Sequence, residues 1–218
     1  YVRHPGVTAA AVATIDELSD GRAFVGIGTG GGLTLGPLGI DRRKPVDTVG
    51  QMVSSLRGLF AGETVDTDGE VFSLRSASLA YGRPDIEVIL AGRGPKILSL
   101  GGEVADGFNL SYIHKDLIGE HVSALRSATR QKDRRFTITY STMLVTSEEE
   151  FQKARSTLSF RLVDSPTAVR RLIGMTEEEV VGIREALAEG GTTVAADLVR
   201  EEWVSQFTIV GSPREAGA

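Results

Sequence analysis

The sequence has no cysteine among its 218 residues. Disulfides, thiolate metal sites and a cysteine nucleophile are therefore excluded. It also has no apolar run near the roughly 20 residues that span a bilayer, and no signal peptide is visible. We expect a cytoplasmic protein without a membrane partner.

An excess of positive charge is also absent, because 29 acidic residues outnumber the 24 Lys and Arg residues, which gives a formal net charge of -5 and a pI of about 5.3. A nucleic-acid-binding domain would carry a basic footprint, so no nucleic-acid partner is expected. The three short basic clusters "DRRKP", "RQKDRR" and "VRR" are interpreted as solvated surface.

Residues for acid–base or metal chemistry are few. The three histidines, His4, His114 and His121, do not have the spacing of metal ligands, so no metal site is predicted. His114 follows the end of a predicted strand, so one alternative is that it lines a site there. A packed or solvated ring is the simpler interpretation for all three histidines.

The acidic residues do not identify a catalytic pair either. Asp16 is expected at the surface near a helix end, and Asp106 closes a later helix. Trp203 is interpreted as a core residue. The catalytic residue therefore stays unknown.

Glycine, in contrast, is abundant, and "FVGIGTGGG" contains the pattern G-x-G-x-x-G at Gly26, Gly28 and Gly31. A dinucleotide-binding turn needs a helix that opens directly on the last glycine. The following "LTLGPLGIDRRKP" shows no helical periodicity before about Val46, so we interpret the stretch as a long loop after a parallel strand. Its backbone would let a ligand approach closely, although a flexible loop tip is the alternative.

A second glycine turn follows a later strand, in "LAGRGPKIL". Pro95 suits the first helical position, so the helix would present unpaired amides beside Arg93 and Lys96 to an anionic group such as a phosphate. We expect Gly94 to lie in a turn that favours positive φ. The alternative is a tight connection between strand and helix, with both cations solvated.

Strands and helices alternate along the chain, which predicts an α/β fold with parallel strands. About five strands are of the type found in a barrel, which needs eight. The helix after Pro5 carries an apolar stripe at helical spacing, and Asp68-Gly69 predicts a hairpin. The expected strands lie at 23–28, 86–91, 108–111, 136–145 and 207–210, and the helices at about 7–18, 46–60, 95–104 and 117–130, with a helix-rich tract at 148–204.

Three stretches together, "RHPGVTAAAVATIDELSDGRAFVGIGTGGG", "LRGLFAGETVDTDGEVFSL" and "ILAGRGPKILSLGGEVADGFNLSY", resemble the luciferase-like monooxygenase superfamily. Within it, the chain is most similar to the coenzyme F-420-dependent, methylenetetrahydromethanopterin reductase-like oxidoreductases. The likeness runs from Arg3 to about Tyr112, and the closing "FTIVGSP" is also similar.

The resemblance implies a TIM (β/α)8 barrel that is incomplete in this chain, with the first strands and the last strand missing; both ends look cut. It implies one partial barrel domain over 1–218, with a hairpin excursion at about 62–80 and a helical insertion at about 147–204. It also implies coenzyme F-420, an 8-hydroxy-5-deazaflavin, as the cofactor, with FMN as the alternative. The implied cofactor-binding residues are Gly28, Thr29, Gly30 and Thr34 near the ring and side chain, and Ala91, Gly92, Arg93, Gly94 and Lys96 near the ribityl phosphate.

The implied function is hydride transfer between reduced coenzyme F-420 and a small organic substrate. The resemblance also implies that the protein is a homodimer. An FMN-dependent monooxygenase of the same superfamily is the second hypothesis. A catalytically silent flavin-binding or structural remnant is the third.

Overall fold

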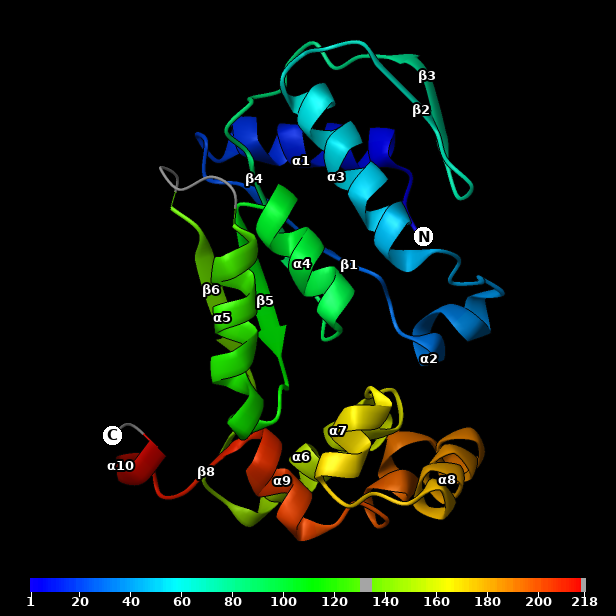
Figure 1. Ribbon diagram of the computed structural model, residues 1–218, viewed down its shortest axis with the longest axis vertical. Helices are drawn as coiled ribbons and strands as arrows, with labels where there is room; N and C mark the ends of the chain where they lie inside the picture. The colour runs from blue at the N-terminus through cyan, green and yellow to red at the C-terminus, as the bar shows by residue number, and fades with distance from the viewer. Residues whose placement is uncertain (130–134, 217–218) are drawn as a thin grey trace. The chain divides into compact units, whose positions relative to one another are not determined.

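The computed structural model describes residues 1–129 and 135–216 (Figure 1). Five residues of the basic cluster "RQKDRR", 130–134, lie outside this part. The chain divides into two compact units, one formed by Tyr1–Asn109 and His121–Thr139 and the other by Leu110–Glu120 and Tyr140–Ala218. Each unit is treated in turn.

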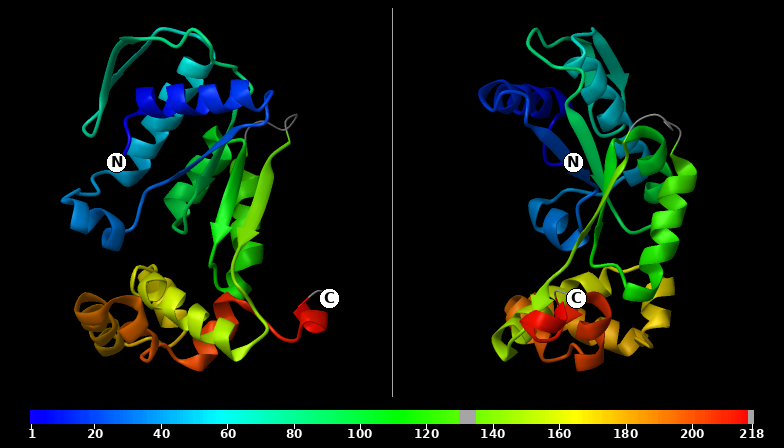
Figure 2. Two further views of the ribbon diagram at one scale, coloured as in Figure 1. Left: turned by 180° about the vertical axis from the view of Figure 1, so that it is seen from behind. Right: turned by 90° about the vertical axis from the view of Figure 1, so that its left-hand side faces the viewer.

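The first unit is built on a four-stranded sheet with the order β1-β4-β5-β6. Its strands are β1 (Phe24–Gly28), β4 (Glu87–Ala91), β5 (Gly107–Ser111) and β6 (Thr137–Ser141), of which β5 and β6 end in the second unit. The pairs β1–β4 and β4–β5 are parallel, which confirms the predicted strand–helix–strand unit. Figure 2 shows these strands from two further sides.

The longer described helices that accompany this sheet are α1 (Pro5–Leu18), α3 (Pro45–Phe60), α4 (Pro95–Val104) and α5 (Ile118–Ala128), the last preceded by the short η2 (Lys115–Leu117). The apolar face predicted for α3 is confirmed, because Val49, Val53 and Leu56 are buried. Helix α4 lies so close to β5 that a Cβ at Gly101 would come within 2.3 Å of the Phe108 ring. Glycine is needed there for close packing.

Helix α1 is confirmed, but its apolar stripe is not buried. Val7, Ile15 and Leu18 are 60, 57 and 84% exposed, whereas the small residues Ala9 and Ala13 are buried. Alanine allows the helix to approach α3 closely, which longer side chains would prevent.

The expected surface position of Asp16 is wrong. This carboxylate is 5% exposed and accepts two hydrogen bonds from Arg83, at 2.9 and 3.0 Å. A hydrogen bond from Arg83 lowers the pKa of Asp16. The pair connects α1 to the segment that leads into β4.

The predicted hairpin is confirmed as β2 (Val65–Asp68) and β3 (Ser73–Ala77), which form an antiparallel sheet of their own. Asp68 pairs with Ser73, and the Gly69 N–H donates to the Phe72 carbonyl at 3.1 Å. The loop therefore has four residues.

One expectation about the first glycine loop is wrong. A one-turn helix, α2 (Gly32–Leu35), begins directly after Gly31 and is followed by the 3-10 turn η1 (Gly36–Leu38). So short a helix gives no detectable periodicity, which is why the sequence did not indicate it.

The second unit is mainly helical. Its helices are α6 (Glu148–Val163), α7 (Thr167–Leu172), α8 (Glu177–Ala196), α9 (Glu201–Phe207) and α10 (Pro213–Ala216). Trp203 is fully buried, as expected, and its indole N–H donates to the Ile173 carbonyl at 3.0 Å. The core around it includes Leu158, Leu162 and Ile183.

The strand predicted over 136–145 is two strands, β6 and the short β7 (Leu144–Val145). β7 pairs in parallel with β8 (Ile209–Val210), in a separate two-stranded sheet. The final strand thus does not join the main sheet, which has four strands rather than five, and no closed barrel exists among the described residues. None of the described helices is long and apolar enough to cross a membrane.

Candidate functional site

The two predicted glycine loops leave the same edge of the main sheet. In the parallel register of β1 and β4, Gly28 is the partner of Ala91, and each is the last residue of its strand. A Cβ at Gly28 would lie 3.7 Å from the Ala91 carbonyl oxygen. The structure therefore brings the two loops together at the carboxyl ends of neighbouring strands, where ligands of α/β folds bind.

The second loop ends in an uncapped helix N-terminus. Gly94 is the N-cap of α4, with φ -94° and ψ 154°, and no side chain caps the helix. A Cβ at Gly94 would meet nothing within 4 Å. The expected positive φ is thus wrong, but the open space and the uncapped amides of the first turn fit an anionic group.

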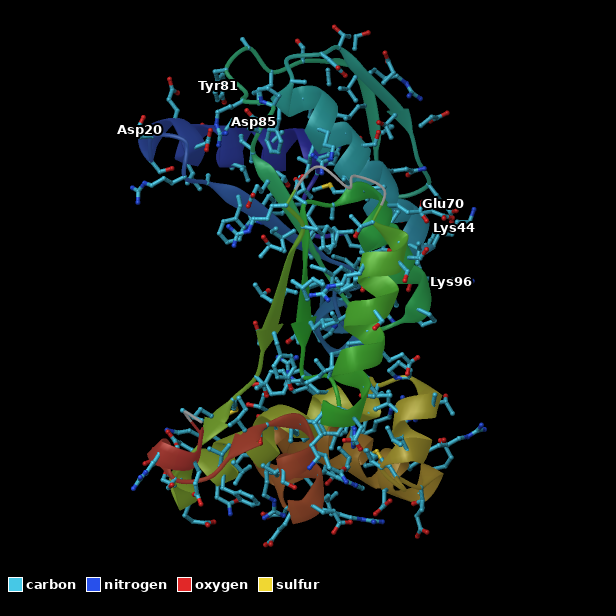
Figure 3. All side chains as sticks on the ribbon, turned by 60° about the vertical axis from the view of Figure 1, so that its left-hand side comes forward. Asp20, Lys44, Glu70, Tyr81, Asp85 and Lys96 are labelled. Carbon is cyan, nitrogen blue, oxygen red and sulfur yellow. The ribbon has the colours of Figure 1, made fainter. Side chains whose placement is uncertain are left out.

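Gly92 is the position in this loop that needs glycine for packing. A Cβ there would come within 2.5 Å of Ile97 Cγ2, on the first turn of α4. Arg93 is half-buried and Lys96 is exposed (Figure 3). Close helix–strand packing therefore explains one glycine of this turn, and Gly94 remains open to a ligand.

In the first loop, Gly30 has a backbone conformation that favours glycine. Its φ is +72°, and the Leu35 side chain lies 3.2 Å from the position of an added Cβ. The Gly30 carbonyl accepts hydrogen bonds from Arg42 Nη1 at 2.9 Å and from the Thr29 hydroxyl at 3.4 Å. Thr34 lies on α2, where its side chain is exposed and its amide donates to the Gly31 carbonyl.

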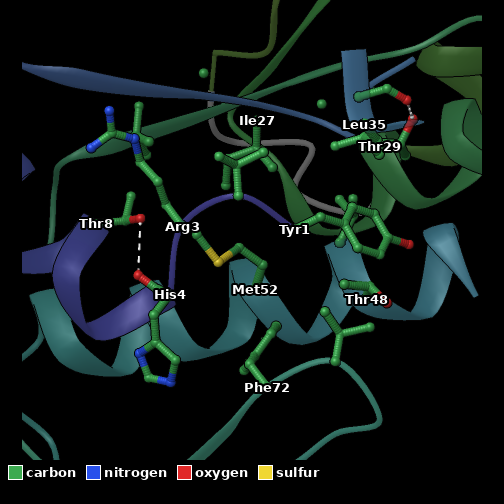
Figure 4. Close-up of a pocket in the computed structure, with 17 residues that line it drawn as sticks. Tyr1, Arg3, His4, Thr8, Ile27, Thr29, Leu35, Thr48, Met52 and Phe72 are labelled. Carbon is green, nitrogen blue, oxygen red and sulfur yellow. Dashed lines mark hydrogen bonds between the residues drawn. The ribbon is translucent and has the colours of Figure 1, made fainter. Parts of the chain in front are cut away.

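A cavity of about 370 Å³ lies beside β1 in the first unit (Figure 4). It is lined by the first residues of the chain, β1 and its loop, one face of α3 and the turn of the hairpin. Of the predicted site residues, Gly28, Thr29 and Gly30 line it, whereas Thr34 and the residues from Ala91 to Lys96 do not. Lining residues that sequence reasoning missed are Tyr1, Arg3, Met52 and Phe72.

His4, at the rim of this cavity, has a specific structural role that sequence reasoning did not find. Its Nδ1 accepts from the Gly6 N–H at 3.2 Å and caps α1, so the proton is on Nε2, which lies 3.0 Å from the Ser73 carbonyl. Its ring also packs edge-on against Phe72. His4 therefore connects the start of α1 to the hairpin.

His114 belongs to the second unit and is packed, as interpreted. It is 4% exposed, its ring packs edge-on against Phe207, and its Nδ1 accepts from the Asp116 N–H. Burial lowers the pKa of His114, so the ring is neutral at pH 7.

A tyrosine and an arginine also meet in the second unit, and the sequence did not indicate this pair. Tyr112 follows β5 with φ +49°, which is unusual for a bulky residue, and the Arg161 guanidinium lies 4.0 Å from the centre of its ring. Burial raises the pKa of Tyr112 and lowers that of Arg161. The Tyr112 hydroxyl therefore stays neutral at neutral pH.

Comparison with known families gives a match over the full chain, residues 1–218, to the model described as "Luciferase-like monooxygenase". The chain belongs to this family. The resemblance seen in the sequence is thereby confirmed.

Similar family members include reductases and a dehydrogenase. The 5,10-methylenetetrahydromethanopterin reductase of Archaeoglobus fulgidus is 32% identical over 98% of this chain and 67% of its own length. The reductase of the same name from Methanolobus tindarius is 27% identical over 100% of this chain and 69% of its own. The F420-dependent glucose-6-phosphate dehydrogenase of Beutenbergia cavernae is 39% identical, over 48% of this chain and 32% of its own.

Solved structures of luciferase-like proteins show the same fold. The coenzyme F420 dependent tetrahydromethanopterin reductase from Methanopyrus kandleri superposes with a TM-score of 0.82 at 22% identity, covering 99% of this chain and 69% of that one. An F420-dependent secondary alcohol dehydrogenase gives 0.64 at 18% identity, covering 99% and 64%. The α/β fold of the luciferase-like barrel type is confirmed.

Proposed function

We propose that this chain belongs to an oxidoreductase that transfers hydride between reduced coenzyme F-420 and a small organic substrate. The observation that carries the proposal is the pairing of Gly28 with Ala91, which sets two glycine loops side by side at the carboxyl edge of a luciferase-like sheet. The names of the similar reductases and dehydrogenases support the choice of coenzyme. When bound, the deazaflavin supplies the hydride chemistry, and the protein positions and shields it.

We assign the two loops different parts of the coenzyme. The first loop lets its backbone approach the ring and the side chain of the coenzyme. Its residues in this role are Gly28, Thr29, Gly30 and Thr34. The second loop receives the phosphate through the uncapped amides of α4 and through two cations. Its residues in this role are Ala91, Gly92, Arg93, Gly94 and Lys96. The acid–base residue stays unassigned.

The decisive experiment is a titration of this chain with coenzyme F-420 and, separately, with FMN, followed by fluorescence. Gly94→Val should weaken binding of coenzyme F-420 at least about 10-fold, because its methyl groups fill the approach to the helix amides while its extended φ and ψ suit valine. The matched control is Gly119→Val, at an exposed glycine where an added Cβ also meets nothing within 4 Å.

Each outcome of the titration has a defined meaning. Tighter binding of FMN would favour the second hypothesis, a monooxygenase, which the name of the family model suggests. Binding of neither cofactor would favour the structural form of the third hypothesis, because a silent flavin-binding remnant would still bind one of them. Wild-type affinity in Gly94→Val would show that the phosphate does not bind at α4.

Three further assignments are also proposals. The segments 62–80 and 147–204 are excursions from one partial barrel domain over 1–218, which the family match over the whole chain supports. The protein is a homodimer, and it acts in the cytoplasm. The molecular mass from analytical ultracentrifugation tests the homodimer, and cell fractionation tests the cytoplasmic location.

A further inference from the structure

The basic segment 41–44, interpreted from the sequence as solvated surface, also contacts the hairpin turn and the first glycine loop. Arg43 pairs with Asp41 at 3.5 Å, and Lys44 pairs with Glu70 of the hairpin turn at 2.9 Å (Figure 3). Arg42 differs, since no acidic partner reaches it in the part of the chain that the structure describes. Its Nη1 instead donates to the Gly30 carbonyl at 2.9 Å.

This hydrogen bond fixes the orientation of one peptide plane in the first glycine loop. In a trans peptide the N–H of Gly31 points opposite to the carbonyl of Gly30. Gly30 has φ +72°, and glycine has more conformational freedom than any other residue, so the backbone itself does little to hold this peptide plane in one orientation. A guanidinium that holds the carbonyl therefore also sets the direction of the next N–H donor.

We propose that Arg42 is a positioning residue for the cofactor, acting through Gly30 rather than by touching the cofactor itself. This inference rests on the proposed function. It gives the arginine a role that its exposed position did not suggest, because an exposed cation contributes little by charge alone.

The test compares Arg42→Ala with Arg43→Ala, two neighbouring arginines of the same segment. The Tyr1 hydroxyl and Thr48 hydroxyl donate to the main-chain carbonyl of Arg43, so the second variant leaves both bonds in place. Arg42→Ala should weaken binding of coenzyme F-420 about 3- to 10-fold, as expected for one lost hydrogen bond. Arg43→Ala should stay within about twofold of the wild type.

Arg42→Gln separates position from charge, since its amide keeps an N–H donor and removes the positive charge. It should recover part of the lost affinity, and the salt dependence of binding should match that of the wild type. A loss of affinity that is equal in Arg42→Gln and Arg42→Ala and disappears at high salt would overturn the inference, because it would indicate a direct charge contact.

A measurement without cofactor tests the effect of Arg42 on the loop separately from the proposed function. The amide NMR signals of Gly30 and Gly31 should move in Arg42→Ala and stay in place in Arg43→Ala. If the wild type bound no coenzyme F-420 while these signals moved, the proposed function would fail and the positioning of the loop would stand. Unmoved signals in Arg42→Ala would overturn the inference.

Discussion

At the scale of single residues, burial determines the protonation of His114. Burial lowers its pKa below the usual value of 6.5, while the nearby Asp116 carboxylate raises the pKa and the Lys115 ammonium lowers it further. The folded protein therefore binds the proton less readily than the unfolded chain. The resulting stability is complete above about pH 6.5 and is lost as the pH falls toward the folded-state pKa.

We expect the ring signals of His114 to titrate in NMR below pH 6.5, and urea unfolding to require less denaturant at pH 5.5 than at pH 7.5. His114→Asn keeps a side chain that can cap the following turn and removes the titrating ring, so part of this pH dependence should disappear. A measured pKa of 6.5 or higher would contradict the argument.

Glycines illustrate how much one residue type depends on its neighbours. Gly30 needs its positive φ, Gly92 is required by the contact with Ile97, and Gly94 has an extended backbone with free space around it. Of these three glycines, only Gly94 leaves free space where a ligand can lie in place of a side chain.

At the scale of elements, helix α8 contains two glycines that should respond oppositely to alanine. Gly182 has helical geometry, and a Cβ there would lie 4.0 Å from Leu198, an ordinary contact. Gly191 interrupts the helix with φ 70° and ψ -162°, a region open essentially to glycine alone.

Urea unfolding should show that Gly182→Ala raises the free energy of unfolding by about 0.4–1 kcal/mol. Gly191→Ala should lower it by about 1–3 kcal/mol. If Gly191→Ala were as stable as the wild type, the interruption of α8 would not depend on a glycine conformation.

At the scale of the whole molecule, the exposed apolar stripe of α1 is the least expected surface. Val7, Ile15 and Leu18 lie on one side of the helix, and each is more than half exposed. Exposed apolar side chains that neighbour each other, as Ile15 and Leu18 do at i,i+3, form patches that bind hydrophobic dyes or other proteins.

The double variant Ile15→Ser with Leu18→Ser should therefore lower the fluorescence of the dye anilinonaphthalene sulfonate bound to the native chain. The control pair is Leu144→Ser with Leu172→Ser, since each of these leucines is 50% exposed in the second unit. An equal decrease in dye fluorescence for both pairs would indicate that α1 binds the dye no better than other exposed leucines do.

The sequence by itself determined the fold class, the family and most element boundaries. Helix α4 begins at Pro95 and ends at Val104 as predicted, because proline at a first turn and periodic apolar residues are local signals. The two glycine loops were found for the same reason.

Only the tertiary structure decided which of these local elements meet. It paired Gly28 with Ala91, buried the alanine side of α1 instead of its larger apolar residues, and paired β8 with β7. It also revealed that Arg42 reaches the Gly30 carbonyl. Strand pairing, burial and side-chain reach depend on residues far apart in the chain, which a pattern within a short window cannot represent.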